Sequence, residues 1–366
     1  MKRILISGGG TGGHIFPAIS IADAMKRRYP DAKILFVGAL GRMEMERVPA
    51  AGYEIIGLPV AGFDRKRLWR NFKVLWKLNK SIRMAKRIVR EFKPDIAIGV
   101  GGYASGPTLK AAQKAGVPTL IQEQNSYPGV TNKLLAPNAG AICTAYEGLE
   151  KYFPADKIIL TGNPVRKGLS EKELSPQEAK KKLGFDPSRP LLLVVGGSLG
   201  ARTINEAMAA GMGHLLQDGD LQILWQTGRN GEKLGHDTTD GLDDVVATPF
   251  ISDMATAYRA ADLVVSRAGA GTISELQLLG KPVILIPSPN VAEDHQRHNA
   301  EALADNDAAV MILDAEAVAK LPAVIKELIN DPGRRATLAA NILKMAQPQS
   351  DERIADQADK LMNKNS

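Results

Sequence analysis

Residues 2–17 read KRILISGGGTGGHIFP, a short apolar run that meets a glycine cluster, with a helical stretch expected from about Pro17. Glycine lets the backbone approach a phosphate closely, and the start of a helix offers N–H groups and a partial positive charge. The stretch therefore predicts a strand, a glycine-rich turn and a helix, which is the repeating unit of nucleotide-binding α/β domains.

Strand-like runs alternate with helical stretches along most of the 366 residues. Repeated βα units with apolar strands indicate parallel sheets covered by helices on both faces. The predicted fold class is therefore α/β with two Rossmann-like domains, and the pattern lapses between residues 162 and 190, where we expect the boundary. The expected strands are 2–7, 33–38, 95–99, 118–122, 141–144 and 157–161, then 191–195, 221–226, 245–247, 262–266, 282–287 and 309–313.

Three more turns repeat the pattern of the first. Residues 99–107 and 196–201 are glycine-rich and follow expected strands, and residues 267–275 open a helix with small side chains. Each places backbone N–H groups where an anion can bind. Glu275, one turn into the last of these helices, is placed to accept hydrogen bonds from sugar hydroxyls, or else to complement the helix dipole.

Other nucleotide-binding and catalytic classes fit less well. Residues 8–13 satisfy the dinucleotide pattern G-x-G-x-x-G, but the second expected strand ends without an acid to hold an NAD ribose. Residues 196–200 satisfy the nucleophile-elbow pattern G-x-S-x-G around Ser198, yet a hydrolase needs one such turn and this chain has three glycine-rich ones. No G-x-x-x-x-G-K-[ST] occurs, which excludes a P-loop NTPase.

Neither a metal nor a cofactor is expected. The single cysteine, Cys143, excludes an intramolecular disulfide and a cysteine-based zinc site, and it fits a reducing compartment. The acids at 218 and 220 flank a glycine between an expected helix and strand, where an ordinary turn explains them.

The net charge of +7 is concentrated in one segment. Residues 64–93 contain twelve Lys or Arg and two acids, so this segment carries +10 and the rest of the chain −3. Apolar side chains recur within it at helical spacing, and a basic amphipathic helix with aromatic residues is typical of an element lying in an anionic membrane surface. Packing of the same side into the core is the alternative, and no nucleic-acid module accompanies the segment. The membrane residues expected are Leu68, Trp69, Phe72, Lys73, Trp76 and Lys77.

The longest apolar runs reach about six residues, whereas a bilayer-spanning helix needs about 20. The first apolar run meets glycine too early for a signal peptide. The sequence therefore predicts a protein of the cytoplasm.

The chain contains eight motifs, at residues 8–14, 101–107, 123–125, 162–166, 196–201, 250–254, 266–275 and 295–299. They resemble, in the same order, the motifs of the MurG family of bacterial glycosyltransferases, and the resemblance covers essentially the whole chain. It implies a GT-B fold with two Rossmann-like domains, UDP-GlcNAc as donor and lipid I (undecaprenyl-diphospho-MurNAc-pentapeptide) as acceptor. The products would be lipid II and UDP, in peptidoglycan synthesis, which supports cell shape and division.

The resemblance also implies that the two domains bind different substrates. Residues 1–164 would form the acceptor and membrane-associating domain, to which a helix at about 345–366 returns, and residues 165–344 would bind UDP-GlcNAc. The location would be peripheral, on the anionic inner face of the cytoplasmic membrane, with cell-wall synthesis proteins as possible partners and no nucleic acid.

The site residues implied by the resemblance fall in both domains. The acceptor would lie near Gly102, Tyr103 and Ser105, and Gln122 departs from the histidine that many members have at that position. Donor contacts would come from Thr11, Gly12, Gly13, Asn125, Arg166, Ser198, Phe250, Ile251, Ala270, Gly271, Thr272, Ile273, Ser274, Glu275 and Gln296.

Inverting transfer needs a base for the acceptor 4-hydroxyl and charge stabilisation for the departing diphosphate. His14 is the first choice as base, because neutral imidazole is well matched near pH 7, and Glu123 is the second. Helix N-termini and Arg166 would stabilise the leaving group. A UDP-GlcNAc 2-epimerase, another transferase with a lipid acceptor and a catalytically silent nucleotide-sugar-binding protein remain as alternatives.

Overall fold

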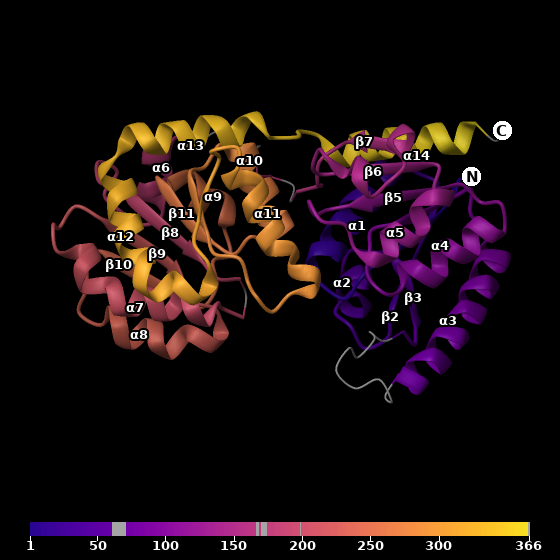
Figure 1. Ribbon diagram of the computed structural model, residues 1–366, viewed down its shortest axis with the longest axis horizontal. Coiled ribbons are helices and arrows are strands. Elements are labelled where there is room, and N and C mark those ends of the chain that lie inside the picture. Colours follow the sequence, from indigo (N-terminus) through magenta and orange to yellow (C-terminus); the bar gives the residue numbers. More distant parts are fainter. Residues whose placement is uncertain (61–70, 166–167, 170–173, 198, 365–366) are drawn as a thin grey trace. The chain divides into compact units, whose positions relative to one another are not determined.

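The computed structural model describes residues 1–60, 71–165, 168–169, 174–197 and 199–364. The chain forms two compact units, one of Met1–Val165 with Gln347–Ser366 and one of Arg166–Ala346. In both units every strand pairing is parallel, and helices cover the sheets (Figure 1). The predicted fold class of two parallel α/β domains is confirmed.

In the described part of the first unit, seven strands form a sheet in the order β3-β2-β1-β4-β5-β6-β7. The strands are β1 (Arg3–Ser7), β2 (Lys33–Ala39), β3 (Glu54–Leu58), β4 (Ile96–Gly99), β5 (Thr119–Glu123), β6 (Ala141–Thr144) and β7 (Ile158–Leu160). The sequence predicted six of them and missed β3. This strand lies at the edge of the sheet, and its short apolar run contains Gly57 and is followed by Pro59, two residue types that are unfavourable in strands.

Helices cover both faces of this sheet (Figure 1). One face packs mainly against α1 and the C-terminal helix α14, which places Ile354, Ala355 and Ala358 in the core. The other face packs against α3, α4 and α5. The helices are α1 (Gly12–Arg28), α2 (Glu44–Ala50), α3 (Asn71–Phe92), α4 (Ser105–Lys114), α5 (Val130–Leu135) and α14 (Ser350–Asn363).

In the second unit, the described residues contribute six strands in the order β10-β9-β8-β11-β12-β13. They are β8 (Leu191–Val195), β9 (Gln222–Gln226), β10 (Val245–Thr248), β11 (Leu263–Ser266), β12 (Val283–Leu285) and β13 (Val310–Met311). The helices are α6 (Pro176–Lys182), α7 (Arg202–Leu216), α8 (Glu232–Thr239), α9 (Met254–Ala260), α10 (Ala270–Leu279), α11 (His295–Ala304), α12 (Ala317–Asn330) and α13 (Pro332–Lys344).

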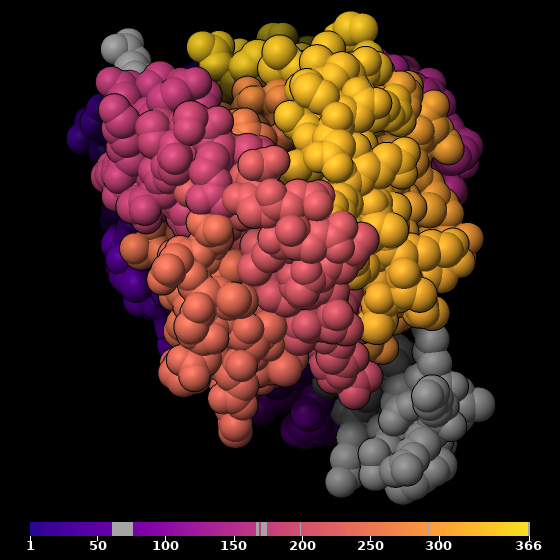
Figure 2. Space-filling view, turned by 90° about the vertical axis from the view of Figure 1, so that its left-hand side faces the viewer, coloured from indigo at the N-terminus to yellow at the C-terminus, as the bar shows by residue number. Residues whose placement is uncertain are grey.

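A core around the buried Trp225 joins β8, β9 and β11 to α7 and α12. Figure 2 shows one face of this unit, where the yellow α12–α13 region lies beside the pink region that contains α7 and α8.

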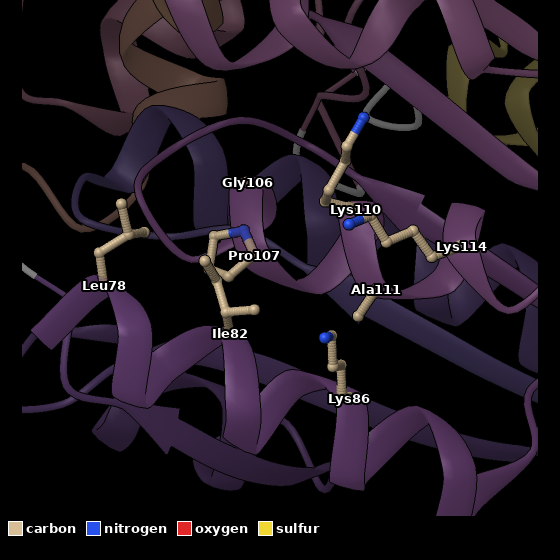
Figure 3. Close-up of a pocket in the computed structure, with 8 residues that line it drawn as sticks. All are labelled: Leu78, Ile82, Lys86, Gly106, Pro107, Lys110, Ala111 and Lys114. Atoms are coloured by element: carbon tan, nitrogen blue, oxygen red, sulfur yellow. The ribbon is translucent and has the colours of Figure 1, made fainter. Parts of the chain in front are cut away.

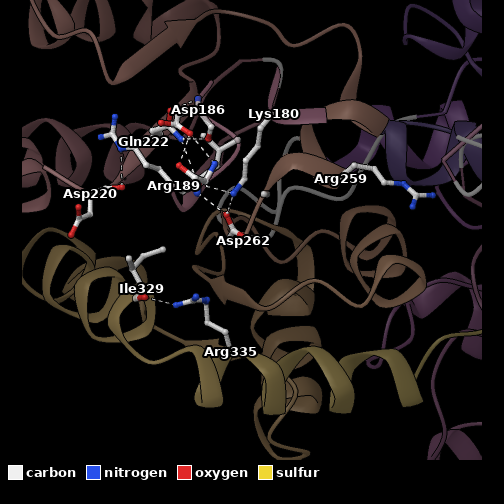
Figure 4. A network of polar contacts seen from close by, with 12 residues as sticks. Lys180, Asp186, Arg189, Asp220, Gln222, Arg259, Asp262, Ile329 and Arg335 are labelled. Atoms are coloured by element: carbon white, nitrogen blue, oxygen red, sulfur yellow. Dashed lines mark hydrogen bonds and ion pairs between the residues drawn. The ribbon is translucent and has the colours of Figure 1, made fainter. Parts of the chain in front are cut away.

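The polar stretch that precedes β8 is held against the second sheet (Figure 4). Lys180 is 5% exposed, and its ammonium group lies 2.7 Å from the Asp262 carboxylate and donates to the Arg189 carbonyl at 2.7 Å. Asp262 also accepts from the Leu191 N–H at 2.8 Å. These bonds connect α6 to Leu191, the first residue of β8, and to Asp262, the residue before β11. This part of the stretch therefore packs as part of the second unit.

Each sheet reverses its strand order once, between β1 and β4 and between β8 and β11. In doubly wound sheets, ligands bind beyond the carboxyl ends of the strands at this reversal. The turns that follow β1, β4, β8 and β11 are the four small-residue turns singled out in the sequence. The topology therefore places two of them together in each unit.

Candidate functional site

In the first unit, the turns after β1 and β4 are in direct contact. A methyl group at Gly102 would come within 2.3 Å of the Gly9 carbonyl oxygen, and Gly102 has φ +84°. Only glycine fits such a position without strain. The hydroxyl of Ser105, which is fully buried, lies 2.7 Å from the Ser7 carbonyl and 2.8 Å from the Gly101 carbonyl. Ser105 therefore shapes the turn from within, while Tyr103 is 57% exposed beside it.

His14 lies in the first turn of α1, next to these glycines. Its Nδ1 is 3.1 Å from the Gly9 carbonyl oxygen and 3.2 Å from Thr11 Oγ1. A carbonyl only accepts, so we assign the ring hydrogen of neutral His14 to Nδ1 and the lone pair to Nε2. A methyl group at Gly101 would come within 2.9 Å of Nε2, so the basic nitrogen faces the turn after β4.

Glu123 ends β5 and is 2% exposed. Its carboxylate accepts four hydrogen bonds, from the N–H of Asn125 (3.0 Å), the N–H of Gly129 (3.2 Å) and the side-chain amides of Asn125 (3.3 Å) and Asn132 (2.8 Å). Burial raises the pKa of Glu123, and these bonds oppose part of the rise. The arrangement fixes the loop that carries Asn125.

Gln122, the position that departs from the family pattern, is completely buried. The side-chain NH₂ of Gln122 donates to Asn163 Oδ1 at 2.8 Å, and its side-chain oxygen Oε1 accepts from the side-chain amide of Gln124. Gln124 also donates to the Val100 carbonyl at 2.8 Å. Gln122 thus belongs to a network that links the end of β5 to the turn after β4 and to Asn163.

Sequence reasoning missed one buried acid at this site. Glu44 is 1% exposed, and it accepts hydrogen bonds from the backbone N–H groups of Gly10 and Ala39. It lies five residues beyond β2, in the sequence RMEMER, which resembles an exposed helical segment. No local signal distinguishes it from Glu46, which is exposed on the same helix.

In the second unit, α10 starts directly after the turn that follows β11. The N-cap residue is Gly269, so no side chain at that position caps the helix, and the first turn of α10 contains no acid. The expected donor residues Ala270–Ser274 form this first turn and a half, and their N–H end is suited to an anion. Glu275 follows, 5% exposed, and accepts from the Tyr258 hydroxyl at 3.1 Å.

Two other expected donor positions have structural partners. The Ile251 N–H donates to Gln226 Oε1 at 3.0 Å, which orients the segment after the exposed Phe250. Gln296, in α11, accepts from the Ser288 N–H at 2.9 Å. Arg166 and Ser198 lie outside the described residues, so their expected roles stay predictions.

Two domain models of one enzyme family match this chain. Residues 4–144 match the glycosyltransferase family 28 N-terminal domain, and residues 191–357 match the family 28 C-terminal domain. A curated relative from Parabacteroides distasonis is 57% identical over 364 residues, which cover 99% of both chains. The chain belongs to glycosyltransferase family 28. A relative from Phocaeicola vulgatus is 58% identical over 99% of this chain and 97% of its own.

Both relatives are named UDP-N-acetylglucosamine--N-acetylmuramyl-(pentapeptide) pyrophosphoryl-undecaprenol N-acetylglucosamine transferase. Among solved structures, MurG of Acinetobacter baumannii is similar with a TM-score of 0.81, at 28% identity over 98% of this chain and 100% of that one. The predicted membership of the MurG family and the GT-B architecture are confirmed. A UDP-GlcNAc 2-epimerase from Neisseria meningitidis shares the fold at 14% identity and a TM-score of 0.67, over 98% and 100% of the chains.

The described side chains of the basic helix α3 divide between the core and the surface. Ala85, Ile88 and Val89 pack into the core, as the alternative interpretation expected. Trp76 is 65% exposed, and the Lys80 ammonium lies 5.5 Å from its ring centroid. Lys77 is exposed as well. Leu68 and Trp69 lie outside the described residues, as do the side chains of Phe72 and Lys73.

A groove of about 180 Å³ runs between α3 and α4 (Figure 3). Its walls are mostly apolar, and three lysines line it, Lys86 from α3 and Lys110 and Lys114 from α4. Across the described part of the chain, we find no helix long and apolar enough to span a bilayer. The same residues contain no cluster of three or more His, Cys, Asp or Glu side chains suited to a metal ion.

Proposed function

We propose that this chain transfers GlcNAc from UDP-GlcNAc to the 4-hydroxyl of MurNAc in lipid I, with inversion, and releases lipid II and UDP. The observation that carries the proposal is the 57–58% identity, over nearly the full length, to transferases whose names state this donor and this acceptor. The two strand-order reversals, one beside an imidazole and one beside an open helix start, supply the chemistry that such a transfer needs.

The second unit is proposed to bind the donor. UDP leaves with negative charge on its diphosphate, and the N-terminus of α10 stabilises an anion by about 0.3–2 kcal/mol. Arg166 and Ser198 would add contacts to the diphosphate. Glu275 would accept hydrogen bonds from the ribose hydroxyls, and the backbone at Ile251 would meet the uracil edge.

The first unit is proposed to bind the acceptor and to supply the base. Nε2 of His14 takes the proton of the acceptor 4-hydroxyl while the oxygen of that hydroxyl attacks the anomeric carbon of GlcNAc. The bond between this carbon and the diphosphate breaks, and UDP keeps its electron pair. Gly102 and the exposed Tyr103 would lie along the acceptor. We propose Glu123 as a positioning residue, because its oxygens already accept four N–H bonds.

Glu275→Gln is expected to raise the KM for UDP-GlcNAc by about 10-fold, because hydrogen bonds to a charged acceptor are worth about 1.5–3 kcal/mol and an amide retains part of them. Tyr258→Phe is the matched control, since it removes the hydrogen bond from the Tyr258 hydroxyl to Glu275 and leaves the Glu275 carboxylate in place. Steady-state kinetics with varied donor would check this. Equal KM values for Glu275→Gln and the wild type would exclude the ribose contact.

The reaction itself is tested by incubating the protein with labelled UDP-GlcNAc, with and without lipid I. Label is expected in the lipid fraction only when lipid I is present. Formation of ManNAc without acceptor would instead indicate an epimerase. Transfer to diacylglycerol but not to lipid I would indicate a different lipid acceptor, and binding without turnover a silent protein.

We also propose peripheral binding to the anionic inner face of the cytoplasmic membrane, through the exposed side chains of α3 at Trp76, Lys77 and Lys80 and the lysine-lined groove between α3 and α4. Lys77 and Lys80 are exposed beside Trp76 on this helix, and Lys86 is exposed farther along it, at the groove. Each basic side chain near an anionic surface contributes about 1 kcal/mol, and salt screens this attraction.

Trp76→Ala is expected to weaken binding to vesicles that contain phosphatidylglycerol without lowering the melting temperature, because the ring is mostly exposed. Leu343→Ala, at a 52% exposed position on α13, is the matched control. Co-sedimentation with vesicles at low and high salt measures the effect. Binding that is unchanged by Trp76→Ala, or that is equal on neutral vesicles, would contradict the proposal.

A further inference from the structure

The buried acid Glu44 is packed against the first glycine-rich turn. Its two carboxylate oxygens lie 3.2 and 3.1 Å from the Gly10 nitrogen, and Oε1 accepts from the Ala39 N–H at 2.9 Å. Both oxygens therefore face N–H donors, as suits an ionised carboxylate. A methyl group at Gly9 would come within 2.1 Å of Oε1, so the turn leaves no space between backbone and acid.

One peptide group connects this carboxylate to His14. The N–H that points to Glu44 belongs to Gly10, and the carbonyl of the same peptide belongs to Gly9 and lies 3.1 Å from His14 Nδ1. In a trans peptide the N–H and the C=O point in opposite directions. The carboxylate and the imidazole therefore bind the two ends of one peptide group.

Hydrogen bonds in such a chain polarise one another. A carboxylate at the N–H end increases the electron density on the carbonyl oxygen, and a more negative Gly9 oxygen binds the Nδ1 hydrogen of His14 more strongly. This favours the form of the ring with its lone pair on Nε2. It also stabilises the imidazolium that forms once Nε2 has taken a proton.

We propose that Glu44 is a positioning residue for the transfer reaction and that it acts on His14 through the Gly9–Gly10 peptide. The inference rests on the proposed role of His14 as the base. No proton crosses the peptide: the hydroxyl proton ends on Nε2, the hydroxyl oxygen forms the new bond to the anomeric carbon, and UDP keeps the electron pair of the bond that breaks. Glu44 contacts no substrate and sets the orientation and tautomer of the group that does.

The kinetic test compares Glu44→Gln with Glu46→Gln. Glutamine keeps the size and one acceptor oxygen of Glu44 but removes the charge, so kcat is expected to fall about 10- to 100-fold, as for loss of a charge-assisted hydrogen bond. The KM for UDP-GlcNAc is expected to change little, because the donor contacts proposed above lie mainly in the second unit. Glu46 is exposed on the same helix, and its substitution should leave both constants unchanged.

The spectroscopic test needs no substrate. ¹⁵N NMR of the ring is expected to show wild-type His14 with hydrogen on Nδ1 and a lone pair on Nε2, and Glu44→Gln with an increased Nε2–H population. A wild-type ring that carries its hydrogen on Nε2 would overturn the inference, even if the variant fails to fold. A folded Glu44→Gln protein with wild-type ring signals and wild-type kcat would overturn it as well.

Failure of the proposed function gives a different pattern. The protein could show the expected ring tautomer, and its change in Glu44→Gln, without any transfer to lipid I. That result would support the connection between Glu44 and His14 and contradict the proposed reaction.

Discussion

Replacing His14 by alanine is expected to lower kcat by about 10² to 10⁴, the usual contribution of a positioned general base. Donor affinity should change little, because α10 and Glu275, the main donor contacts proposed, belong to the second unit. The fold should also persist, since His14 is only partly buried and its ring hydrogen bonds join it to a turn already held by Glu44.

Steady-state kinetics with a short-chain lipid I analogue would measure kcat, and calorimetry with UDP-GlcNAc would measure donor affinity. His236→Ala is the matched control, because this histidine is exposed in the second unit with a 79% exposed side chain. A His14→Ala enzyme with near-normal kcat would eliminate His14 as the base. A large loss of donor affinity would instead assign it to donor binding.

Glu123→Ala is expected to lower the free energy of unfolding of the first unit by about 3–5 kcal/mol at neutral pH. The substitution leaves the buried amide of Asn132 and the partly buried N–H groups of Asn125 and Gly129 without this acceptor, and an unpaired donor costs up to about 3 kcal/mol when it is fully buried. Urea denaturation followed by far-ultraviolet circular dichroism would measure the loss, because the helices of the first unit contribute to this signal whereas the buried Trp225 belongs to the second unit. Glu150→Ala, at an exposed position of the same unit, should stay within about 0.5 kcal/mol of the wild type.

The sign of the pH dependence follows from the raised pKa of Glu123. The folded state binds the proton more tightly than the unfolded state, so this contribution to stability is present below the ordinary pKa of the carboxyl and is lost as pH rises through the raised value. The difference in the free energy of unfolding between the wild type and Glu123→Ala should therefore become smaller as the pH rises. If Glu123→Ala keeps wild-type stability and loses kcat, Glu123 is the base and the positioning role is wrong.

Much of the fold was predictable, because the signals for it are local. Short apolar runs followed by glycine and a helical period identify a βα unit wherever they occur, and the twelve expected strands all have counterparts in the structure. The edge strand β3 was missed, because Gly57 lies within its short apolar run and Pro59 follows it, and both residue types are unfavourable in strands. The four turns were predictable for the same local reason, since the small residues that form them are contiguous.

The partners of the buried polar groups were not predictable. Glu44 lies 34 positions from Gly10, and Tyr258 lies 17 positions from Glu275. Nothing in either local sequence indicates that these side chains meet. The same holds for the basic helix α3, in which Ala85, Ile88 and Val89 join the core while Trp76 stays exposed.

The sequence by itself thus determined the class of fold, the family and the turns at which chemistry is expected, since these depend on residue type and spacing along the chain. Only the tertiary structure decided which acid packs against the turn that holds His14, which acid accepts four N–H bonds, and which side chains of α3 remain at the surface. The physical reason is that a buried carboxylate is stable only where donors from distant segments converge, and packing of the sheet alone brings those segments together.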